Sequence, residues 1–129
     1  MSIFKQIVFT GGTGRFGKIF RKINSDKKYV YPTKKELNIT SLKSVENYIK
    51  RKKPKTLIHA AGLSRPMKIH EKNIMKSIDK NIIGTCNLVK TCSKYKVKIV
   101  YLSTSYVYPG KKGNYNEKSP LLPYNNYSW

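Results

Sequence analysis

Three glycines spaced three residues apart, Gly11, Gly14 and Gly17, form the stretch best suited to hold a ligand. They follow an apolar run that ends at Phe9 and precede a segment with helical periodicity. In such a strand–turn–helix the first glycine allows a tight turn, the second lets phosphates approach bare backbone, and the third lets the helix pack closely. The helix N-terminus then favours an anion. The spacing therefore predicts a site for the pyrophosphate of a dinucleotide.

The phosphate-binding loop of nucleoside triphosphatases is an alternative interpretation of the same stretch. Gly12 to Lys18 fits the pattern G-x-x-x-x-G-K. That loop continues with a serine or threonine that holds magnesium, whereas Ile19 stands at this position. The missing hydroxyl and the additional glycine at position 14 favour a dinucleotide over ATP.

The histidines and cysteines indicate neither a metal site nor a disulfide. His59 and His70 each lack a second ligand at metal-binding spacing. Cys86 and Cys92 fall six residues apart on one predicted helix, which places them on different faces. We therefore expect no metal and two reduced, partly buried thiols.

Hydrophobic periodicity predicts alternating strands and helices along the chain. Four strands are expected at residues 3–10, 29–31, 56–59 and 98–102. Helices are expected from residue 16 to 23, from a cap at Thr40 or Ser41 to residue 53, and from about 71 to 95. This order indicates an α/β fold, a Rossmann-like doubly wound parallel sheet that is truncated after the fourth strand.

Each of the three predicted helices carries an apolar face, which in the second comprises Leu42, Val45, Tyr48 and Ile49. The predicted inward-facing residues of the first are Phe16, Ile19, Phe20 and Ile23. Those of the last are Ile74, Ile78, Ile82, Thr85, Val89 and Cys92. A doubly wound sheet binds its ligand outside the carboxyl ends of its strands. Four segments converge there, at residues 10–17, 33–35, 59–62 and 103–105.

Composition narrows the class of protein. The 129 residues suffice for one domain but are short for a complete cofactor-binding enzyme. The formal net charge of +21 comes from lysines spread through every segment without an aromatic stripe, so we expect no specific nucleic-acid partner. The sequence has no recognisable signal peptide or membrane span, and a cytoplasmic location is expected.

Taken together, seven motifs resemble the extended short-chain dehydrogenase/reductase superfamily, and within it the dTDP-4-dehydrorhamnose reductase group. They cover essentially the whole chain and occur in the order of that group. The motifs are TGGTGRFG at 10–17, ELNIT at 36–40, IHAAG at 58–62, Asn81 with Gly84-Thr85, STSYVY at 103–108, GNYNE at 113–117 and PYNNY at 123–127.

The resemblance implies catalytic roles for Thr104 and Tyr127. Thr104 matches the residue that hydrogen-bonds the substrate oxygen, and Tyr127 matches the tyrosine that exchanges a proton with it while nicotinamide transfers a hydride. In the family a lysine four residues after the tyrosine lowers its pKa, and that position, 131, lies beyond Trp129. The implied cofactor-binding residues are Gly11, Thr13, Gly14, Arg15, Phe16, Gly17, Thr33, Lys34, Asn38, Ile39, Ala60, Ala61, Gly62, Asn81 and Ser103.

The end of the second strand favours NADP, although NAD remains possible. Members that prefer NAD place an acidic residue there, whereas this chain has Thr33, Lys34 and Lys35, which suit a 2′-phosphate. Asn38 stands where the family usually has an aspartate near the adenine.

The function expected is that of the N-terminal part of an NAD(P)-dependent reductase of a nucleotide-linked keto sugar, with a possible homodimer in the full-length parent. Two alternatives remain: an epimerase or dehydratase relative, and a non-catalytic dinucleotide-binding or regulatory subunit. Dehydratases of this family carry Asp-Glu after the threonine, where this chain has Ser105-Tyr106. The sheet edge at the fourth strand is expected to be exposed, and this chain alone is expected to show little or no turnover.

Overall fold

Four parallel strands form the centre of the molecule in the computed structural model, which describes residues 6–111 and 113–129. The strands are β1 (Ile7–Thr10), β2 (Tyr29–Val30), β3 (Thr56–His59) and β4 (Lys98–Tyr101). Their order in the sheet is β2-β1-β3-β4, and every neighbouring pair is parallel. The predicted Rossmann-like sheet is therefore confirmed, while the predicted residues 3–5 of the first strand lie outside the described part.

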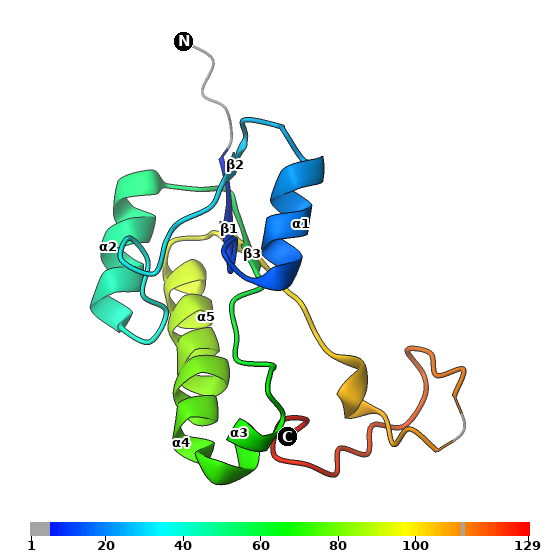
Figure 1. Cartoon of the computed structure of the whole chain (residues 1–129). Coiled ribbons are helices and arrows are strands. Elements are labelled where there is room, and N and C mark those ends of the chain that lie inside the picture. Colours follow the sequence, from blue (N-terminus) through cyan, green and yellow to red (C-terminus); the bar gives the residue numbers. More distant parts are fainter. Residues whose placement is uncertain (1–5, 112) are drawn as a thin grey trace.

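Helices cover the two faces of the sheet unequally (Figure 1). Helix α1 (Arg15–Ile23) lies on one face, and α2 (Leu42–Lys52) and α5 (Gly84–Lys94) lie together on the other. The change of side follows from right-handed crossovers, because β1 connects outward to β2 and the chain then returns past β1 to β3. The strand order thus reverses between β1 and β3, which is where such sheets bind ligands.

The larger core lies between the sheet and the helix pair α2–α5. Val8 and Leu57 from the central strands are buried against Val45 and Ile49 of α2 and Leu88 of α5. On the other face the aromatic ring of Phe9 stacks on Phe20 of α1 at a centroid distance of 4.7 Å.

The ends of α2 confirm the sequence signals for this helix. The Ser41 hydroxyl accepts a hydrogen bond from the Ser44 amide at 3.3 Å, as an N-cap does. At the other end Lys53 adopts a left-handed conformation with φ of 46°, and Pro54 follows.

The apolar face predicted for α1 has the expected spacing, but most of it is not buried. Phe16, Ile19 and Ile23 are 54%, 63% and 73% exposed, and only Phe20 of the four predicted residues is partly buried. The reason is that α1 is the only helix packed on its side of the described sheet, so one flank of its apolar face has no neighbouring helix.

The helix predicted from about residue 71 to 95 is confirmed from residue 74 to 94, where helical turns continue without a break. The prediction missed the break at Asn73 and the π-helical geometry in the middle of the segment. The segment comprises α3 (Lys68–Lys72), α4 (Ile74–Ser77), the π-helical segment η1 (Ile78–Ile83) and α5. Asn73 leaves the helical conformation between α3 and α4, and its side chain caps α4 by accepting a hydrogen bond from the Lys76 amide.

The buried face of this segment also differs from the prediction. Ile74, Ile82 and Val89 of the predicted face are 37%, 51% and 46% exposed. The predicted Cys92 is buried, together with four residues that were not predicted: Ser77, Gly84, Leu88 and Thr91. A π-helical turn holds more residues than an α-helical one, so the face that meets the sheet changes phase across η1. Gly84 is buried, and an added Cβ there would come within 2.8 Å of the Ile39 side chain.

The segment after β4 is largely irregular and crosses the carboxyl ends of the strands. It contains one short 3₁₀ turn, η2 (Ser105–Val107), and its last residues lie beside α3 (Figure 1). Within the described sheet β4 pairs only with β3, which agrees with the expected exposed edge. No described helix is long and apolar enough to cross a membrane.

Candidate functional site

Two adjoining clefts lie at the carboxyl ends of β1, β3 and β4, at the predicted reversal of strand order. They share the small residues Ala60, Ala61 and Gly62, which follow β3 directly. The cleft beside the glycine turn has a volume of about 440 Å³, and the cleft beside Tyr127 one of about 600 Å³. Because these residues are shared, the cleft at the glycine turn and the cleft at Tyr127 form one elongated surface.

The glycine turn leaves its backbone bare at Gly14. Gly11 has a φ of +81°, and Gly17 packs so closely that an added Cβ would lie 2.2 Å from the Gly11 carbonyl oxygen. At Gly14 an added Cβ would meet only that oxygen, at 3.2 Å, because the other side is open. Gly14 is also the N-cap of α1 and provides no side-chain cap. These features fit a pyrophosphate bound at the helix N-terminus.

Cations predominate on the wall opposite the glycine turn. The predicted residues Thr13, Lys34, Asn38 and Ile39 line this cleft. Three further lining residues come from α4 and η1: Lys76, Asp79 and Lys80. With three lysines and one aspartate, the described lining favours an anionic ligand.

The acidic residue nearest the end of β2 is already engaged elsewhere. The Glu36 carboxylate accepts hydrogen bonds from the Thr33 amide at 2.8 Å and from its hydroxyl at 2.9 Å. These bonds hold the pKa of Glu36 below its usual value. Glu36 does not line the cleft, whereas Lys34 does. The arrangement at this point is therefore cationic.

Four predicted cofactor residues line neither of the two clefts in the structure. Arg15 and Phe16 form the first turn of α1, where Phe16 stacks on Phe9 at 6.1 Å. Gly17 is buried beneath the turn, and Thr33 is occupied with Glu36. Their predicted contact with a cofactor remains a prediction.

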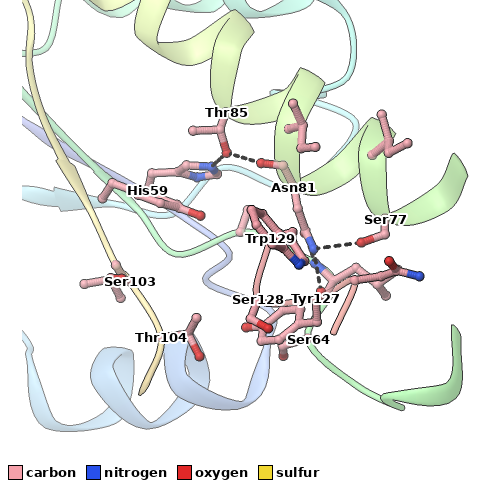
Figure 2. Close-up of a pocket in the computed structure, with 18 of the residues that line it drawn as sticks. His59, Ser64, Ser77, Asn81, Thr85, Ser103, Thr104, Tyr127, Ser128 and Trp129 are labelled. Atoms are coloured by element: carbon pink, nitrogen blue, oxygen red, sulfur yellow. Dashed lines mark hydrogen bonds between the residues drawn. The ribbon is translucent and has the colours of Figure 1, made fainter. Parts of the chain in front are cut away.

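The second cleft brings together the predicted chemistry from distant parts of the chain (Figure 2). Ser103 and Thr104 follow β4, Asn81 comes from η1, and Tyr127 comes from the last segment. Thr104 is the N-cap of η2, and its hydroxyl oxygen accepts a hydrogen bond from the Tyr106 amide at 3.3 Å.

Asn81 anchors the loop that follows β3. Its side-chain oxygen accepts a hydrogen bond from the Leu63 amide at 2.7 Å, and its side-chain nitrogen donates to the Leu63 carbonyl at 2.8 Å. Asn81 was predicted as a cofactor-binding residue, and in the structure it fixes the backbone that separates the two clefts.

His59 joins β1, β3 and the helical layer beneath the site. Its Nδ1 lies 2.9 Å from the Thr10 hydroxyl, and its Nε2 lies 3.0 Å from the Thr85 hydroxyl. Because the Thr85 hydroxyl donates to the Asn81 carbonyl at 2.6 Å, it accepts from His59, whose proton must therefore be on Nε2. Burial lowers the pKa of His59 to about 4, so the imidazole is neutral.

Tyr127 lines the second cleft and has an uncommitted hydroxyl. Its ring packs edge-on against Tyr106 at a centroid distance of 5.6 Å and beside His70 at 4.8 Å. Its hydroxyl makes no hydrogen bond within residues 6–111 and 113–129. A phenol of this kind can donate a hydrogen bond or a proton to a ligand in the cleft.

Several site residues were missed by sequence reasoning. Lys76, Asp79 and Lys80 were not among the predicted site residues, and His70 and Ser77 were not considered as a pair. A signal was present: Ser77, Asn81 and Thr85 recur every four residues and form a polar stripe along one side of the segment (Figure 2). Such a stripe between apolar residues indicates a polar site facing the helix.

The parallel sheet, its glycine turn and the clefts at its switch point define a Rossmann-like protein of the α/β class. The family model described as "RmlD substrate binding domain" matches residues 5–129, and the chain belongs to this family, which is part of the extended short-chain dehydrogenase/reductase group. The family is one of sugar-nucleotide reductases and epimerase-like proteins.

Individual relatives agree with this assignment. The dTDP-4-dehydrorhamnose reductase of Bacillus anthracis str. Ames, solved in complex with NADP, matches with a TM-score of 0.87 and 28% identity over 96% of this chain and 45% of its own. GDP-L-colitose synthase of Yersinia pseudotuberculosis is 29% identical over 107 residues, 81% of this chain and 35% of its own length. The beta subunit of methionine adenosyltransferase 2 of Xenopus tropicalis is 26% identical over 132 residues, 95% of this chain and 39% of its own length. The chain therefore spans less than half the length of each of these relatives.

Proposed function

We propose that this chain forms the dinucleotide-binding and catalytic face of an NADPH-dependent reductase that acts on a nucleotide-linked keto sugar. The observation that carries the proposal is the joined pair of clefts, with the uncapped N-terminus of α1 at one end and Thr104 and Tyr127 at the other. The similarity to a reductase solved with NADP supports the same cofactor. When bound, NADPH would supply a hydride.

The residues of this chain would then have separate tasks. Gly14 and the N-terminus of α1 bind the pyrophosphate, and Lys34 binds the 2′-phosphate. Thr104 holds the substrate oxygen by a hydrogen bond. Tyr127 donates a proton to that oxygen as negative charge develops on it. The side-chain bonds of Asn81 hold the loop after β3 in place as part of the wall of the second cleft.

Replacing Tyr127 by Phe tests the proposal. The assay follows NADPH oxidation at 340 nm with a dTDP-linked 4-keto sugar, in the chain itself and in a version extended to carry a lysine at position 131. We expect Tyr127→Phe to lower kcat by about 100-fold or more. The dissociation constant of NADPH should change by less than about twofold, because the phenol hydroxyl contacts no part of the glycine cleft.

Tyr124→Phe is the matched control, because Tyr124 is 72% exposed and lies three residues away. It should leave both kcat and NADPH affinity unchanged. Equal turnover in the Tyr127→Phe variant and its parent would contradict the proposed proton donor, and failure of every version to bind NADPH would contradict the proposed cofactor.

A non-catalytic dinucleotide-binding subunit is the second candidate function. It is favoured by the similarity to the beta subunit of methionine adenosyltransferase 2, which extends over 95% of this chain. NADPH binding without any Tyr127-dependent turnover, in both the chain and its extended version, would favour this candidate over the reductase.

A further inference from the structure

His70 is a fully buried imidazole to which the proposed reaction gives no role. It lies in α3 with 0% of its surface exposed, and its Nδ1 lies 2.8 Å from the Ser77 hydroxyl. Its Nε2 is buried and has no hydrogen-bond partner among the described residues. Burying a polar ring with one unsatisfied nitrogen costs stability, so its position requires an explanation.

A series of hydrogen bonds fixes this imidazole relative to the cleft. The Asn81 side-chain nitrogen donates to the Ser77 hydroxyl oxygen at 3.4 Å, and Asn81 is itself held by both backbone groups of Leu63. Ser77 therefore has its own hydroxyl hydrogen free to donate to Nδ1 of His70. The ring is thus tied, through two side chains, to the loop that follows β3.

The other side of the imidazole contacts Tyr127. The two ring centroids are 4.8 Å apart with an interplanar angle of 46°, while Tyr106 packs edge-on against Tyr127 at 83°. The preceding residue, Asn126, is bound to α3 as well, because its side-chain nitrogen donates to the Glu71 carboxylate at 2.7 Å and to the His70 carbonyl at 3.4 Å. Residues of α3 therefore contact both the backbone segment and the ring of Tyr127.

We propose that His70, anchored by Ser77, is the positioning residue for Tyr127; this inference rests on the proposed function. Tyr127 lies in the hydrogen-bonded turn at residues 125–129, which belongs to no helix or strand and ends a long irregular segment. The fixed imidazole and Tyr106 both pack against its ring, which lines the second cleft, and so restrict its orientation. Proton transfer needs a donor held within hydrogen-bond distance of the reacting oxygen, so this restriction is directly useful to the reaction.

Amide hydrogen exchange in the last turn measures this positioning without any substrate. The Ser128 and Trp129 amides both donate to the Asn125 carbonyl, at 3.0 and 3.2 Å, so their exchange reports opening of the docked turn. In His70→Ala we expect these amides to exchange about tenfold faster, because the variant loses the ring contact with Tyr127 and the hydrogen bond that anchors that ring to Ser77. His70→Phe, which keeps a ring, should restore about half of the protection on a logarithmic scale, and Ser77→Ala should cause a similar intermediate loss.

Ser93→Ala is the matched control for Ser77→Ala, since Ser93 is an exposed serine of α5, and it should leave exchange unchanged. Circular dichroism establishes that each variant is folded. Unchanged exchange in folded His70→Ala would overturn the proposal; if that variant does not fold, unchanged exchange in Ser77→Ala would overturn it. NADPH affinity should be the same in all variants. A failure of the unaltered chain to bind NADPH at all would refute the proposed function. The exchange data would still decide whether His70 positions Tyr127.

Discussion

Among single residues, Lys34 is the one expected to discriminate between the two dinucleotides. It lines the glycine cleft at the end of β2, while the nearby Glu36 carboxylate is turned to Thr33. A lysine paired with a phosphate makes a charge-assisted hydrogen bond that NADH cannot provide. Lys34→Ala should therefore raise the Kd of NADPH about tenfold and that of NADH by less than about twofold, as measured by cofactor fluorescence.

Lys35→Ala provides the control, because Lys35 is the adjacent exposed lysine and does not line the cleft. Its effect should be small for both cofactors. An equal loss of NADPH and NADH affinity in Lys34→Ala would show that Lys34 does not contact the 2′-phosphate.

His59 predicts how stability depends on pH. Burial lowers its pKa from 6.5 to about 4, so between these values the unfolded chain binds a proton that the folded chain does not. Stability is therefore highest above pH 6.5 and falls as the pH decreases toward 4. Urea unfolding should give a free energy of unfolding about 2 kcal/mol lower at pH 5 than at pH 7.

The His59→Gln variant serves as the control for this titration. Its amide can bond Thr10 and Thr85 but does not titrate, so the free energy should be lower overall and nearly constant from pH 7 to 5. The carboxylates Asp26, Glu36 and Glu46 have pKa values lowered by hydrogen bonds to Lys28, Thr33 and Lys94, so they contribute only at lower pH. A pH dependence that persists in His59→Gln would assign the effect to another group.

At the level of elements, two glycines of the strand–turn–helix formed by β1 and α1 are expected to have different roles. Gly17 should matter for folding and Gly14 for cofactor binding. Gly17→Ala places a Cβ 2.2 Å from the Gly11 carbonyl oxygen, so we expect a loss of about 1–3 kcal/mol in the free energy of unfolding. Gly14→Ala meets only one atom, at 3.2 Å, and its φ of −75° suits alanine. It should unfold normally in urea but bind NADPH about tenfold more weakly, because the methyl group occupies the phosphate side.

The reverse result, with NADPH affinity preserved in Gly14→Ala, would place the pyrophosphate elsewhere. The two substitutions are chemically identical and three residues apart, so each is the control for the other.

The sequence was sufficient for the elements that local signals define. The turn at Gly11, the Ser41 cap and the four strands follow from residue type and spacing, and the structure confirms them. The division of the third crossover could not be predicted, because Asn73 is compatible with a helix interior and nothing local marks a π-helical turn at residues 78–83. The exposure of the apolar residues of α1 depends on which other helices pack on the same side of the sheet, and hydrophobic periodicity within one helix cannot predict this.

The same distinction applies to the candidate site. The glycine turn and the threonine–tyrosine pair were predicted by motif, whereas the lysines at 76 and 80 and the contact of His70 with Tyr127 arise from tertiary packing. Segments more than fifty residues apart meet there, as Asn126 and Glu71 do, and no short-range pattern encodes such a meeting.

For the whole molecule, the formal net charge of +21 should strengthen binding of an anionic cofactor at low ionic strength. The three lysines of the glycine cleft, at 34, 76 and 80, concentrate this charge beside the proposed phosphate site. The Kd of NADPH should rise several-fold between about 50 and 500 mM NaCl, because screening shortens the Debye length from well over 10 Å to a few Å.

Lys80→Gln should reduce this salt dependence, while Lys90→Gln, an exposed lysine of α5 outside both clefts, should not. Isothermal titration at several salt concentrations distinguishes the two variants. A salt dependence that is identical in both would attribute the effect to the overall charge of the chain.

The π-helical segment makes this part of the chain sensitive to length. Removing one residue between 78 and 80 would allow an unbroken α-helix, yet it would rotate Ser77 by about 100° relative to Asn81 and Thr85. Ser77 would then turn away from His70, while the sheet and its core remained intact. The position of Ser77 should therefore be more sensitive to insertions and deletions in this segment than to point substitutions on its exposed side. A cleft transferred to another scaffold would need the same number of residues here as well as the same residue types.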